Sequence, residues 1–319
     1  MKHNQFSQYS ISRFGLGTVK FGFDYGINNP RGQVPFTEIC KIFEMAHKNG
    51  MNFIDTSRFY GTSEENIERA LRETGLSTEF TICTKLDLPR NFPEWSDKDV
   101  ISSCRESLDT SLETLKLERI PFYLLHNFDY KALREGLIWN FVLEEKEKGK
   151  LDIPGISIGV GPEEAFEAGK DESVKALQIP YNIFDSRWRE SGFFTLAGEK
   201  GIALFSRSTY LQGLLLMNEK QIEKKLSSAL PYIKKLRMLL EEFGIRAQEV
   251  ALRYVASEES IFSTVIGVDS SEQYAENLEI IEKGPLPNDL VDRIHAELEA
   301  IPEEIVNPSF WNKPYKGHK

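Results

Sequence analysis

The chain has 319 residues, of which 40% are hydrophobic and 11% aromatic, enough to bury a large core. Its net charge of −10, from 39 basic and 49 acidic residues, argues against nucleic acid or an anionic membrane as the main partner. The polar start, Met-Lys-His-Asn-Gln, predicts no signal peptide, and no apolar run is long enough to span a bilayer.

Eight short apolar runs recur along the chain and predict the strands of one parallel sheet. Between them lie helical patterns, one beginning at Ser63 and stopping at Gly75, another beginning at Ser96. This alternation, without a Ser/Gly/Pro linker, predicts one (β/α)₈ TIM barrel domain over residues 1–319, with an irregular tail from about residue 305. The predicted strands are Phe14–Thr18, Asn52–Asp55, Phe80–Lys85, Phe122–His126, Ile153–Val160, Ala176–Phe184, Ile202–Ser206 and Phe262–Val268.

Four reactive side chains stand where three of these runs end. Asp55 closes the second run and is followed closely by Tyr60, Lys85 closes the third, and His126 closes the fourth. The C-terminal ends of parallel strands meet at one end of a barrel, so we expect the four side chains to lie together there. An adjacent lysine favours phenolate, so we expect the pKa of Tyr60 to fall below its ordinary value of about 10. The carboxylate would balance the ammonium, and the imidazole would donate a hydrogen bond to a substrate oxygen.

Each of the four residues also has a purely structural interpretation when taken singly. Asp55 would then cap a helix, and Tyr60 would be a half-buried aromatic. Lys85 would be a solvated strand end, and His126 a core histidine satisfied by its neighbours. Their joint position at the ends of three adjacent strands favours a proton-transfer site instead.

A glycine pattern in the fifth run has a structural explanation. Gly155, Gly159 and Gly161 spell GxxxGxG, which in short-chain dehydrogenases belongs to a dinucleotide-binding βαβ unit near the start of the chain. Here the pattern lies in the middle of the chain, and no Tyr-x-x-x-Lys follows it. We interpret these glycines as a strand end that permits close backbone approach.

The histidines and cysteines predict neither a metal site nor disulfides. The five histidines show no pairing at ligand spacing. Cys40, Cys83 and Cys104 lack metal-type spacing and are interpreted as buried thiols in a reducing compartment, which points to the cytoplasm.

Short motifs that recur in a fixed order along nearly the whole chain carry a family resemblance. They are Gly15-Leu-Gly-Thr18, Ile54-Asp55-Thr56, Phe59-Tyr60-Gly61, Ser63-Glu64-Glu65, Thr84-Lys85, Leu124-Leu-His126, Gln178-Ile-Pro-Tyr181-Asn182, Leu211-Gln-Gly-Leu-Leu215 and Val265-Ile-Gly267, with Gln273, Glu276 and Asn277. Each motif is weak alone, but the ordered set resembles the aldo-keto reductase family. The resemblance implies the same barrel and NAD(P)H-dependent reduction of a small-molecule carbonyl, either an aldehyde, a ketone or a sugar-derived carbonyl.

The resemblance also implies roles for the four reactive residues. Hydride would pass from the nicotinamide to the carbonyl carbon, and Tyr60 would supply the proton as general acid. Lys85 and Asp55 would tune the pKa of Tyr60, and His126 would hold and polarise the carbonyl.

Cofactor contacts are implied at corresponding motif positions. Ser157 and Gln178 would bind the nicotinamide carboxamide, and Phe205 would stack on the nicotinamide ring. Plain core packing is the alternative for Phe205 and Leu211. The other cofactor residues implied are Gly17, Thr18 and Asp55, then Ser206, Leu211 and Gly213 in the segment that wraps the pyrophosphate, and Gly267, Gln273, Glu276 and Asn277 at the adenosine end.

Two positions depart from the family pattern. Ile158 stands where asparagine usually follows Ser157, so one hydrogen bond to the carboxamide is expected to be missing. Asp269 lies where many members place a partner for the 2′-phosphate of NADP. A carboxylate there would repel that phosphate and accept from a free ribose hydroxyl, so the cofactor is NADP or NAD. Arg207 would compensate as a phosphate partner, or would be a solvated or ion-paired surface residue.

The substrate pocket is less well determined by the sequence. Tyr25 and Trp95 are candidates to line it together with Tyr60 and His126, with packing under long loops as the alternative. Arg58 would meet an anionic or polyhydroxylated substrate, or would belong to a surface ion pair.

A second class of function stays open. Potassium-channel β subunits resemble this chain too, and they keep the barrel and nucleotide site in a regulatory role. The ordered set of four reactive residues favours an enzyme, and Ile158 favours a nucleotide-binding regulatory or scaffold protein. No protein partner is predicted.

Overall fold

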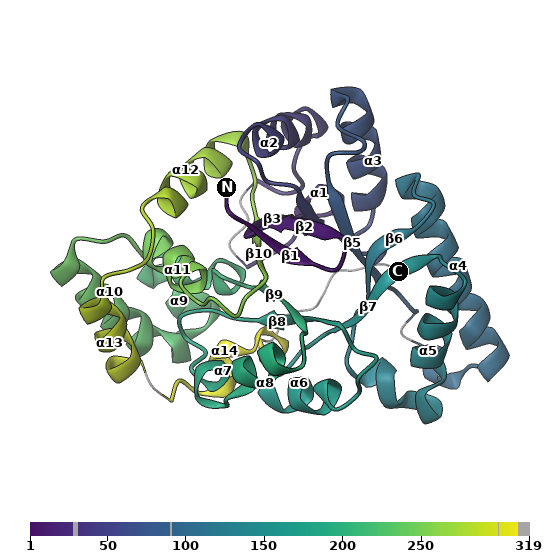
Figure 1. Ribbon diagram of the computed structural model, residues 1–319. Helices are drawn as coiled ribbons and strands as arrows, with labels where there is room; N and C mark the ends of the chain where they lie inside the picture. Colours follow the sequence, from purple (N-terminus) through teal and green to yellow (C-terminus); the bar gives the residue numbers. More distant parts are fainter. Residues whose placement is uncertain (28–30, 90, 299, 312–319) are drawn as a thin grey trace.

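Eight parallel strands close into a barrel at the centre of the molecule (Figure 1). The computed structural model describes residues 1–27, 31–89, 91–298 and 300–311. The strands follow one another around the barrel in chain order, and β10 closes it by pairing with both β9 and β3. The predicted (β/α)₈ fold is therefore confirmed. The barrel strands are β3 (Phe14–Gly17), β4 (Phe53–Asp55), β5 (Thr81–Leu86), β6 (Ile120–Leu125), β7 (Leu151–Ser157), β8 (Ala176–Pro180), β9 (Ala203–Arg207) and β10 (Ser263–Gly267).

Helices surround the barrel and cover the outer face of its sheet (Figure 1). The longer helices are α2 (Phe36–Lys48), α3 (Ser63–Thr74), α4 (Asp97–Leu115), α5 (Asp129–Glu147), α6 (Pro162–Gly169), α10 (Leu230–Phe243), α11 (Ala247–Ala256), α12 (Ser271–Glu282) and α13 (Asn288–Glu297). The shorter helices are α1 (Val19–Gly22), α7 (Arg187–Glu190), α8 (Phe193–Glu199), α9 (Glu219–Lys225) and α14 (Glu303–Val306), with 3₁₀ turns η1 (Phe92–Glu94), η2 (Leu211–Leu216), η3 (Ser227–Ala229) and η4 (Pro308–Phe310).

Three helix boundaries that the sequence predicted are confirmed. Helix α3 begins at Ser63 and ends before Gly75, whose φ of 71° is a left-handed conformation that glycine adopts without strain. Helix α4 begins after Ser96, whose side-chain oxygen accepts a hydrogen bond from the backbone N–H of Asp99. These two helices pack side by side next to the strands that carry Asp55 and Lys85.

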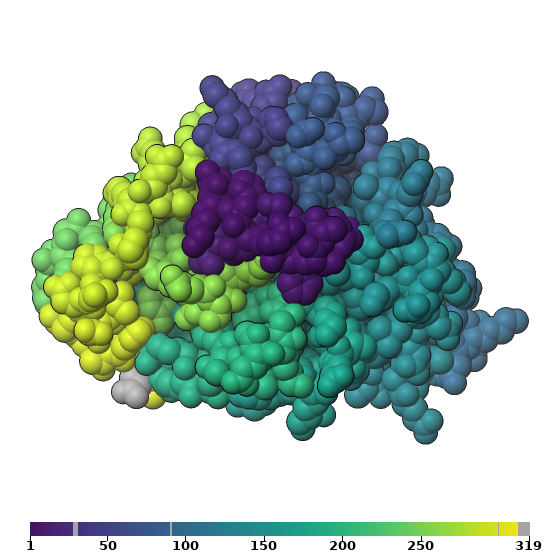
Figure 2. All heavy atoms as spheres, in the orientation of Figure 1, coloured from purple at the N-terminus to yellow at the C-terminus, as the bar shows by residue number. Residues whose placement is uncertain are grey.

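An N-terminal hairpin, which the sequence did not predict, closes one end of the barrel. Strands β1 (His3–Phe6) and β2 (Tyr9–Ser12) pair antiparallel. Phe6 and Tyr9 bring their rings to 6.4 and 5.5 Å from the ring of Phe122, inside the barrel. The first residues of the chain, in purple, lie across the middle of the face in Figure 2. Because this end is covered, access to the barrel lies at the opposite end, where the strands end.

Aromatic side chains fill the interior of the barrel. The rings of Phe53 and Phe205 stack with centroids 4.8 Å apart, and Phe122 meets Phe205 edge-on at 5.2 Å. Gly15 makes room for this packing, because a Cβ atom there would lie 2.4 Å from the Phe53 ring. The interior is therefore a packed core, and Asp55, Lys85 and His126 lie at the ends of the strands above it.

The remaining sequence predictions about the fold are refined by the structure. Cys83 and Cys104 are buried thiols as predicted, but Cys40 is only partly buried. The tail predicted to be irregular holds short turns as far as Trp311, whose indole N–H donates to the Glu304 carbonyl, and residues 312–319 lie outside the described residues. None of the described helices is both long and apolar enough to cross a membrane.

Candidate active site

The structure brings Asp55, Lys85, His126 and Tyr60 together above the barrel core. Asp55 is the last residue of β4, Lys85 lies near the end of β5, and His126 directly follows β6. Tyr60 lies on the loop between β4 and α3, with its ring centroid 5.7 Å from that of His126 and 5.3 Å from the ammonium nitrogen of Lys85. We call this end of the barrel, where the strands end, the mouth.

A buried ion pair lies at the base of this site. The Lys85 side chain is fully buried, and its Nζ donates to Asp55 Oδ1 and to the Thr56 carbonyl, each at 2.7 Å. Asp55 Oδ1 also accepts from Nε2 of Gln178 at 2.7 Å. Burial lowers the pKa of Lys85, but Asp55, Tyr60 and Cys83 each raise it, Asp55 most of the three, and the net shift of the pKa is upward. Lys85 is therefore a permanent cation under Tyr60.

Tyr60 has a pKa above its ordinary value, contrary to the sequence-based expectation. Burial raises the pKa of its phenol, Lys85 lowers it, Asp55 raises it and Arg207 lowers it. The predicted direction was wrong because burial outweighs the two cations, and the charge of Lys85 is largely balanced by Asp55. The phenol is consequently protonated at neutral pH.

His126 is a neutral imidazole whose orientation is set by Ser57. Burial, followed by the charges of Lys85 and Arg207, lowers the pKa of His126 to about 3. Its Nδ1 lies 3.1 Å from Ser57 Oγ, which also accepts from the backbone N–H of Phe59. A Ser57 hydroxyl that donates to Nδ1 leaves the imidazole hydrogen on Nε2. Ser57 was not identified from the sequence, because only the fold brings residues 57 and 126 together.

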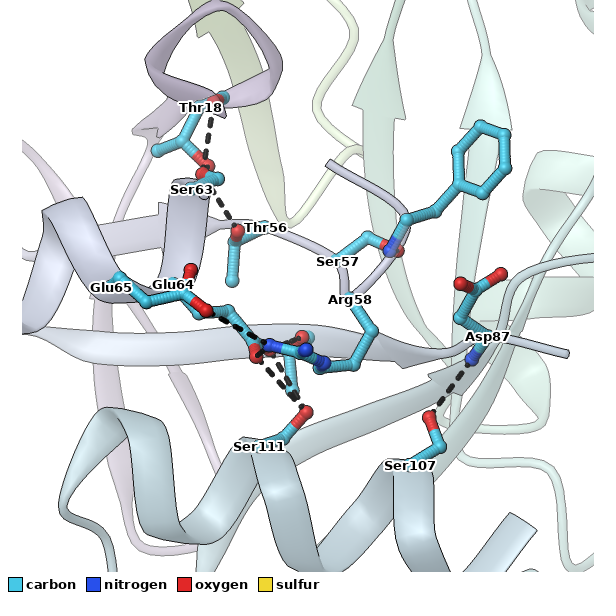
Figure 3. Close-up of polar contacts among 12 residues, drawn as sticks. Thr18, Thr56, Ser57, Arg58, Ser63, Glu64, Glu65, Asp87, Ser107 and Ser111 are labelled. Carbon is cyan, nitrogen blue, oxygen red and sulfur yellow. Dashed lines mark hydrogen bonds and ion pairs between the residues drawn. The ribbon is translucent and has the colours of Figure 1, made fainter. Parts of the chain in front are cut away.

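A second buried carboxylate, Glu64, anchors the loop that carries Tyr60 (Figure 3). Glu64 is fully buried, and its Oε1 accepts from the hydroxyls of Thr84 at 2.6 Å and Ser111 at 2.9 Å. Its Oε2 accepts from Arg58 at 2.8 Å, and Arg58 lies 3.7 Å from Glu65 as well. The ion-pair interpretation of Arg58 is therefore the one that the structure supports. Glu64 links α3, β5 and α4, so it fixes the turn between Asp55 and Tyr60.

Gly22 allows the backbone of helix α1 to approach this turn. A Cβ atom at Gly22 would lie 1.5 Å from the carbonyl oxygen of Tyr60 and 2.8 Å from the backbone nitrogen of Ser63. Both contacts are with backbone, so they are not relieved by rotating a side chain. Only glycine lets α1 support the loop of Tyr60 in this way.

The residues predicted to hold the nicotinamide carboxamide lie together on adjacent strands. Ser157 ends β7 and is in register with Gln178 of β8. Gln178 is 1% exposed, and within the described part of the chain its Oε1 accepts no hydrogen bond. Ile158 is buried, and its carbonyl accepts from Nη2 of Arg207 at 2.8 Å. The charge of Arg207 acts on both Tyr60 and His126, so its side chain lies near them.

Phe205 has the surroundings of a core residue. Its ring is fully buried between Phe53, Phe122 and Phe262, at centroid distances of 4.8 to 5.7 Å. One face of the ring is stacked on Phe53. The core-packing alternative is the one that this arrangement supports, and Leu211, also fully buried, belongs to the largest core cluster.

The segment after β9 is locally strained. Ser208, Leu211 and Gln212 have φ of 66°, 48° and 53°, and Gly213 has φ of 91°. Non-glycine residues rarely adopt such angles, and they cluster where ligands are held. Ser206, just before them, is buried and donates to the Thr264 hydroxyl at 3.0 Å.

At the predicted adenosine end the polar side chains already contact one another. Asp269 pairs with Lys20 at 2.7 Å, and its backbone N–H donates to Gln273 at 2.8 Å. Glu276 pairs with Arg246 at 2.7 Å. Asn277 accepts from Tyr210 at 3.0 Å and from Gln248 at 3.2 Å. Lys20 was not identified from the sequence, because it is 249 residues from Asp269.

Gly17, Thr18 and Gly267 lie at the neighbouring ends of β3 and β10. Gly17 is in register with Gly267 on one side and with Asp55 on the other. The Thr18 hydroxyl donates to the Asp55 carbonyl at 2.9 Å and accepts from Ser63, so it is engaged within the protein (Figure 3).

Of the two further substrate candidates, Tyr25 is linked to Tyr60 through the ring of Phe23. Phe23 contacts both Tyr25 and Tyr60, at ring-centroid distances of 6.2 and 6.3 Å. Trp95 follows η1 in the loop after β5, where it packs against the largest core cluster. The aromatic ring that meets His126 beside Tyr60 is Phe59, at 5.5 Å.

Comparisons with known proteins place this geometry in context. The model of the Aldo/keto reductase family matches residues 13–299. An uncharacterized oxidoreductase, YrpG, of Bacillus subtilis is 24% identical over 85% of this chain and 88% of its own. A probable voltage-gated potassium channel subunit beta of Arabidopsis thaliana is 23% identical over 94% of this chain and 98% of its own. The solved holo form of aldo-keto reductase AKR11C1 from Bacillus halodurans superposes with a TM-score of 0.73 at 22% identity, covering 94% and 97% of the two chains. The last similarity supports the fold.

Replacing Gly22 by alanine is expected to destabilise the protein. The added methyl group meets only backbone atoms of the Tyr60 loop, and such overpacking costs about 1–3 kcal/mol of unfolding free energy. Gly198→Ala is the matched control, because Gly198 lies in α8 with no atom within 4 Å of its Cβ position. That change is expected to leave the stability unchanged or to raise it by up to about 1 kcal/mol. Urea unfolding of both variants measures this, and equal midpoints would contradict the role of Gly22.

Proposed function

The chain belongs to the aldo/keto reductase family, and on this premise we propose that Asp55, Tyr60, Lys85 and His126 are its catalytic residues. It is an NAD(P)-dependent oxidoreductase that interconverts carbonyl and alcohol groups. The observation that carries the proposed roles is the fully buried Lys85–Asp55 pair beneath Tyr60.

Tyr60 is proposed as the general acid. Its raised pKa keeps the phenol protonated at neutral pH, so the proton donor is present before a carbonyl is bound. An alkoxide forming on the substrate is far more basic than a phenolate, so it takes this proton. Lys85, held by Asp55, then stabilises the phenolate that is left.

His126 is proposed to hold the carbonyl oxygen. We propose that Ser57 donates to Nδ1, so that Nε2 carries the hydrogen, and a neutral imidazole donates without attracting the proton of Tyr60. Tyr60 and His126 therefore supply two donors to one oxygen atom, which is the arrangement that stabilises developing negative charge.

The mouth offers polar groups that suit a nicotinamide cofactor. The Oε1 of Gln178 is buried and without a donor among the described residues, and an orphaned buried acceptor is costly unless a ligand satisfies it. A carboxamide N–H₂ is such a donor, and we propose that Gln178 and Ser157 bind it. When bound, the reduced nicotinamide supplies the hydride. Thr18 is proposed to support Asp55 through its backbone carbonyl.

A nucleotide-binding regulatory protein is the alternative function. It is favoured by the similarity to a probable potassium channel subunit beta and by Ile158 in place of asparagine. The enzyme is favoured because Lys85, Asp55, His126 and Tyr60 are all present and in contact. Oxidation of NADH and NADPH across a panel of aldehydes, ketones and sugars distinguishes the two functions.

We propose NADH as the preferred cofactor. Lys20 is the cation nearest to Asp269, and the two are paired at 2.7 Å with both side chains mostly buried. A phosphate brought to this position would meet the Asp269 carboxylate while its potential partner Lys20 is occupied. A free 2′-hydroxyl would instead donate to Asp269.

Tyr60→Phe is expected to lower kcat for carbonyl reduction by at least about a hundredfold while cofactor binding is retained. The variant keeps the ring and its packing but removes the proton. Steady-state rates give the first quantity, and quenching of protein fluorescence by the cofactor gives the second. Near-normal turnover in this variant would refute Tyr60 as the acid.

The pH dependence of reduction follows from the pKa values of Tyr60 and His126. Reduction needs the phenol protonated, so activity is present below the Tyr60 pKa and is lost as the pH rises through it. Because that pKa is raised and the pKa of His126 is about 3, neither group titrates near neutrality. The value of kcat/KM is expected to stay flat between about pH 5 and pH 9. A titration centred near about pH 6.5, the ordinary value for histidine, would show that His126 is not held neutral.

Asp269→Asn is expected to tighten NADPH binding about tenfold and to leave NADH binding nearly unchanged, because it removes a repulsive charge and releases Lys20 to the phosphate. Asp289→Asn, at the exposed start of α13, is the control with the same change in net charge. Fluorescence titration of both cofactors measures the effect. Native protein that binds NADPH about tenfold more tightly than NADH would contradict the assignment.

A further inference from the structure

Among the described residues, Arg207 has no carboxylate partner, whereas Lys85, Arg58 and Lys20 each have one. Lys85 is paired with Asp55, Arg58 with Glu64, and Lys20 with Asp269. In the part of the chain that the structure describes, the half-buried Arg207 side chain contacts only neutral groups. Its Nη2 donates to the Ile158 carbonyl at 2.8 Å, and its Nη1 donates to Ser208 Oγ at 3.1 Å.

Arg207 lies at the mouth of the barrel, the end at which the reacting groups lie. It is the last residue of β9, and its side chain reaches past the end of β8 to the residue after β7. Its charge acts on both Tyr60 and His126, lowering the pKa of each. The guanidinium therefore lies at the same end of the barrel as those two donors, close enough for its charge to act on both.

The contacts of Arg207 leave both its charge and several donors available. A guanidinium has five N–H groups in a planar fork that matches a carboxylate or phosphate, and the two neutral acceptors occupy only two of them. A partly buried cation without a counter-charge is energetically unfavourable. The backbone at Ser208 is also held at φ 66°, a strained angle of the kind found where ligands are clamped.

We propose that Arg207 binds the acidic group of the substrate, so that the enzyme prefers aldehydes or ketones carrying a carboxylate or phosphate near the carbonyl. This rests on the proposed carbonyl reductase function. Arg58, the residue that the sequence suggested for an anionic substrate, is unsuited because Glu64 already neutralises it. The pyrophosphate of the cofactor is another anionic group that a guanidinium binds. The test therefore distinguishes binding of the substrate from binding of the cofactor.

A pair of substrates that differ only in charge provides the test. The probes are 4-formylbenzoate and its methyl ester, which share the aldehyde and the ring. Native enzyme is expected to have the higher kcat/KM for the acid. Arg207→Gln is expected to lower kcat/KM for the acid about 10- to 100-fold, the range of one charge-assisted hydrogen-bonded contact. The same variant should change kcat/KM for the ester less than about threefold and leave the cofactor dissociation constant unchanged.

Two further variants serve as controls. Arg207→Lys keeps the charge but loses the planar fork, so it is expected to recover part of the preference for the acid. Arg72→Gln, on the exposed face of α3, removes an equal charge far from the reacting groups and should change neither substrate.

The outcomes separate this proposal from the proposed function. An equal loss with acid and ester in Arg207→Gln, or a weaker cofactor complex that accounts for the loss, overturns the proposal and assigns Arg207 to the cofactor phosphates. If native enzyme reduces neither aldehyde, ligand binding provides the test. Calorimetry measures the binding of 4-(hydroxymethyl)benzoate and of its methyl ester to the cofactor complex. Native protein is expected to bind the acid more tightly than the ester, and Arg207→Gln is expected to abolish this difference. Equal binding of the two alcohols by native protein also overturns the proposal. Turnover of the ester that Tyr60→Phe abolishes establishes the reductase independently of Arg207.

Discussion

The ion pair between Lys85 and Asp55 is the constraint around which the mouth of the barrel is organised. Removing an ammonium and a carboxylate from water is costly unless each finds partners of good geometry. Here the Thr56 carbonyl takes a second hydrogen of Lys85, and Gln178 donates to the same carboxylate. These hydrogen bonds therefore hold the ends of β4, β5 and β8 in fixed positions relative to one another. This satisfied pair gives Tyr60 a fixed cation beneath its ring, while only a small net charge enters the apolar interior.

A second buried carboxylate, Glu64, extends this organisation to the loop above. Its partners Thr84, Ser111 and Arg58 come from β5, α4 and the loop itself. Thr84 directly precedes Lys85, so the two carboxylates hold adjacent residues of one strand. The loop that carries Tyr60 and Ser57 is thereby fixed relative to Lys85. Such support matters for proton transfer, because a displacement of about 1 Å at a reacting group costs roughly a hundredfold in rate.

Much of this arrangement could be predicted from the sequence, because strand ends are a local property. An apolar run of four to six residues that stops at a charged side chain identifies the end of a parallel strand, and all parallel strands of a barrel end on one side. The barrel and the meeting of Asp55, Lys85 and His126 followed from that rule. The hairpin before β3 was missed because its short strands lack a continuous apolar run. Ser57–His126 and Lys20–Asp269 were missed because their partners are separated by 69 and 249 residues.

The wrong sign for the pKa of Tyr60 illustrates a different limit. From the sequence, a lysine near a tyrosine is a charge acting alone, and its effect is to favour phenolate. The fold adds two effects that the sequence does not express: burial of the phenol, and an aspartate that balances most of the lysine charge. With Lys85, Arg58 and Lys20 each balanced by a carboxylate, the unbalanced charge at the mouth belongs, among these cations, to Arg207. The unbalanced positive charge of the site thus comes from Arg207, a residue whose motif position indicated a cofactor contact. For this reason, we expect the chain to differ in its selectivity for charged substrates from relatives that share its four reactive residues.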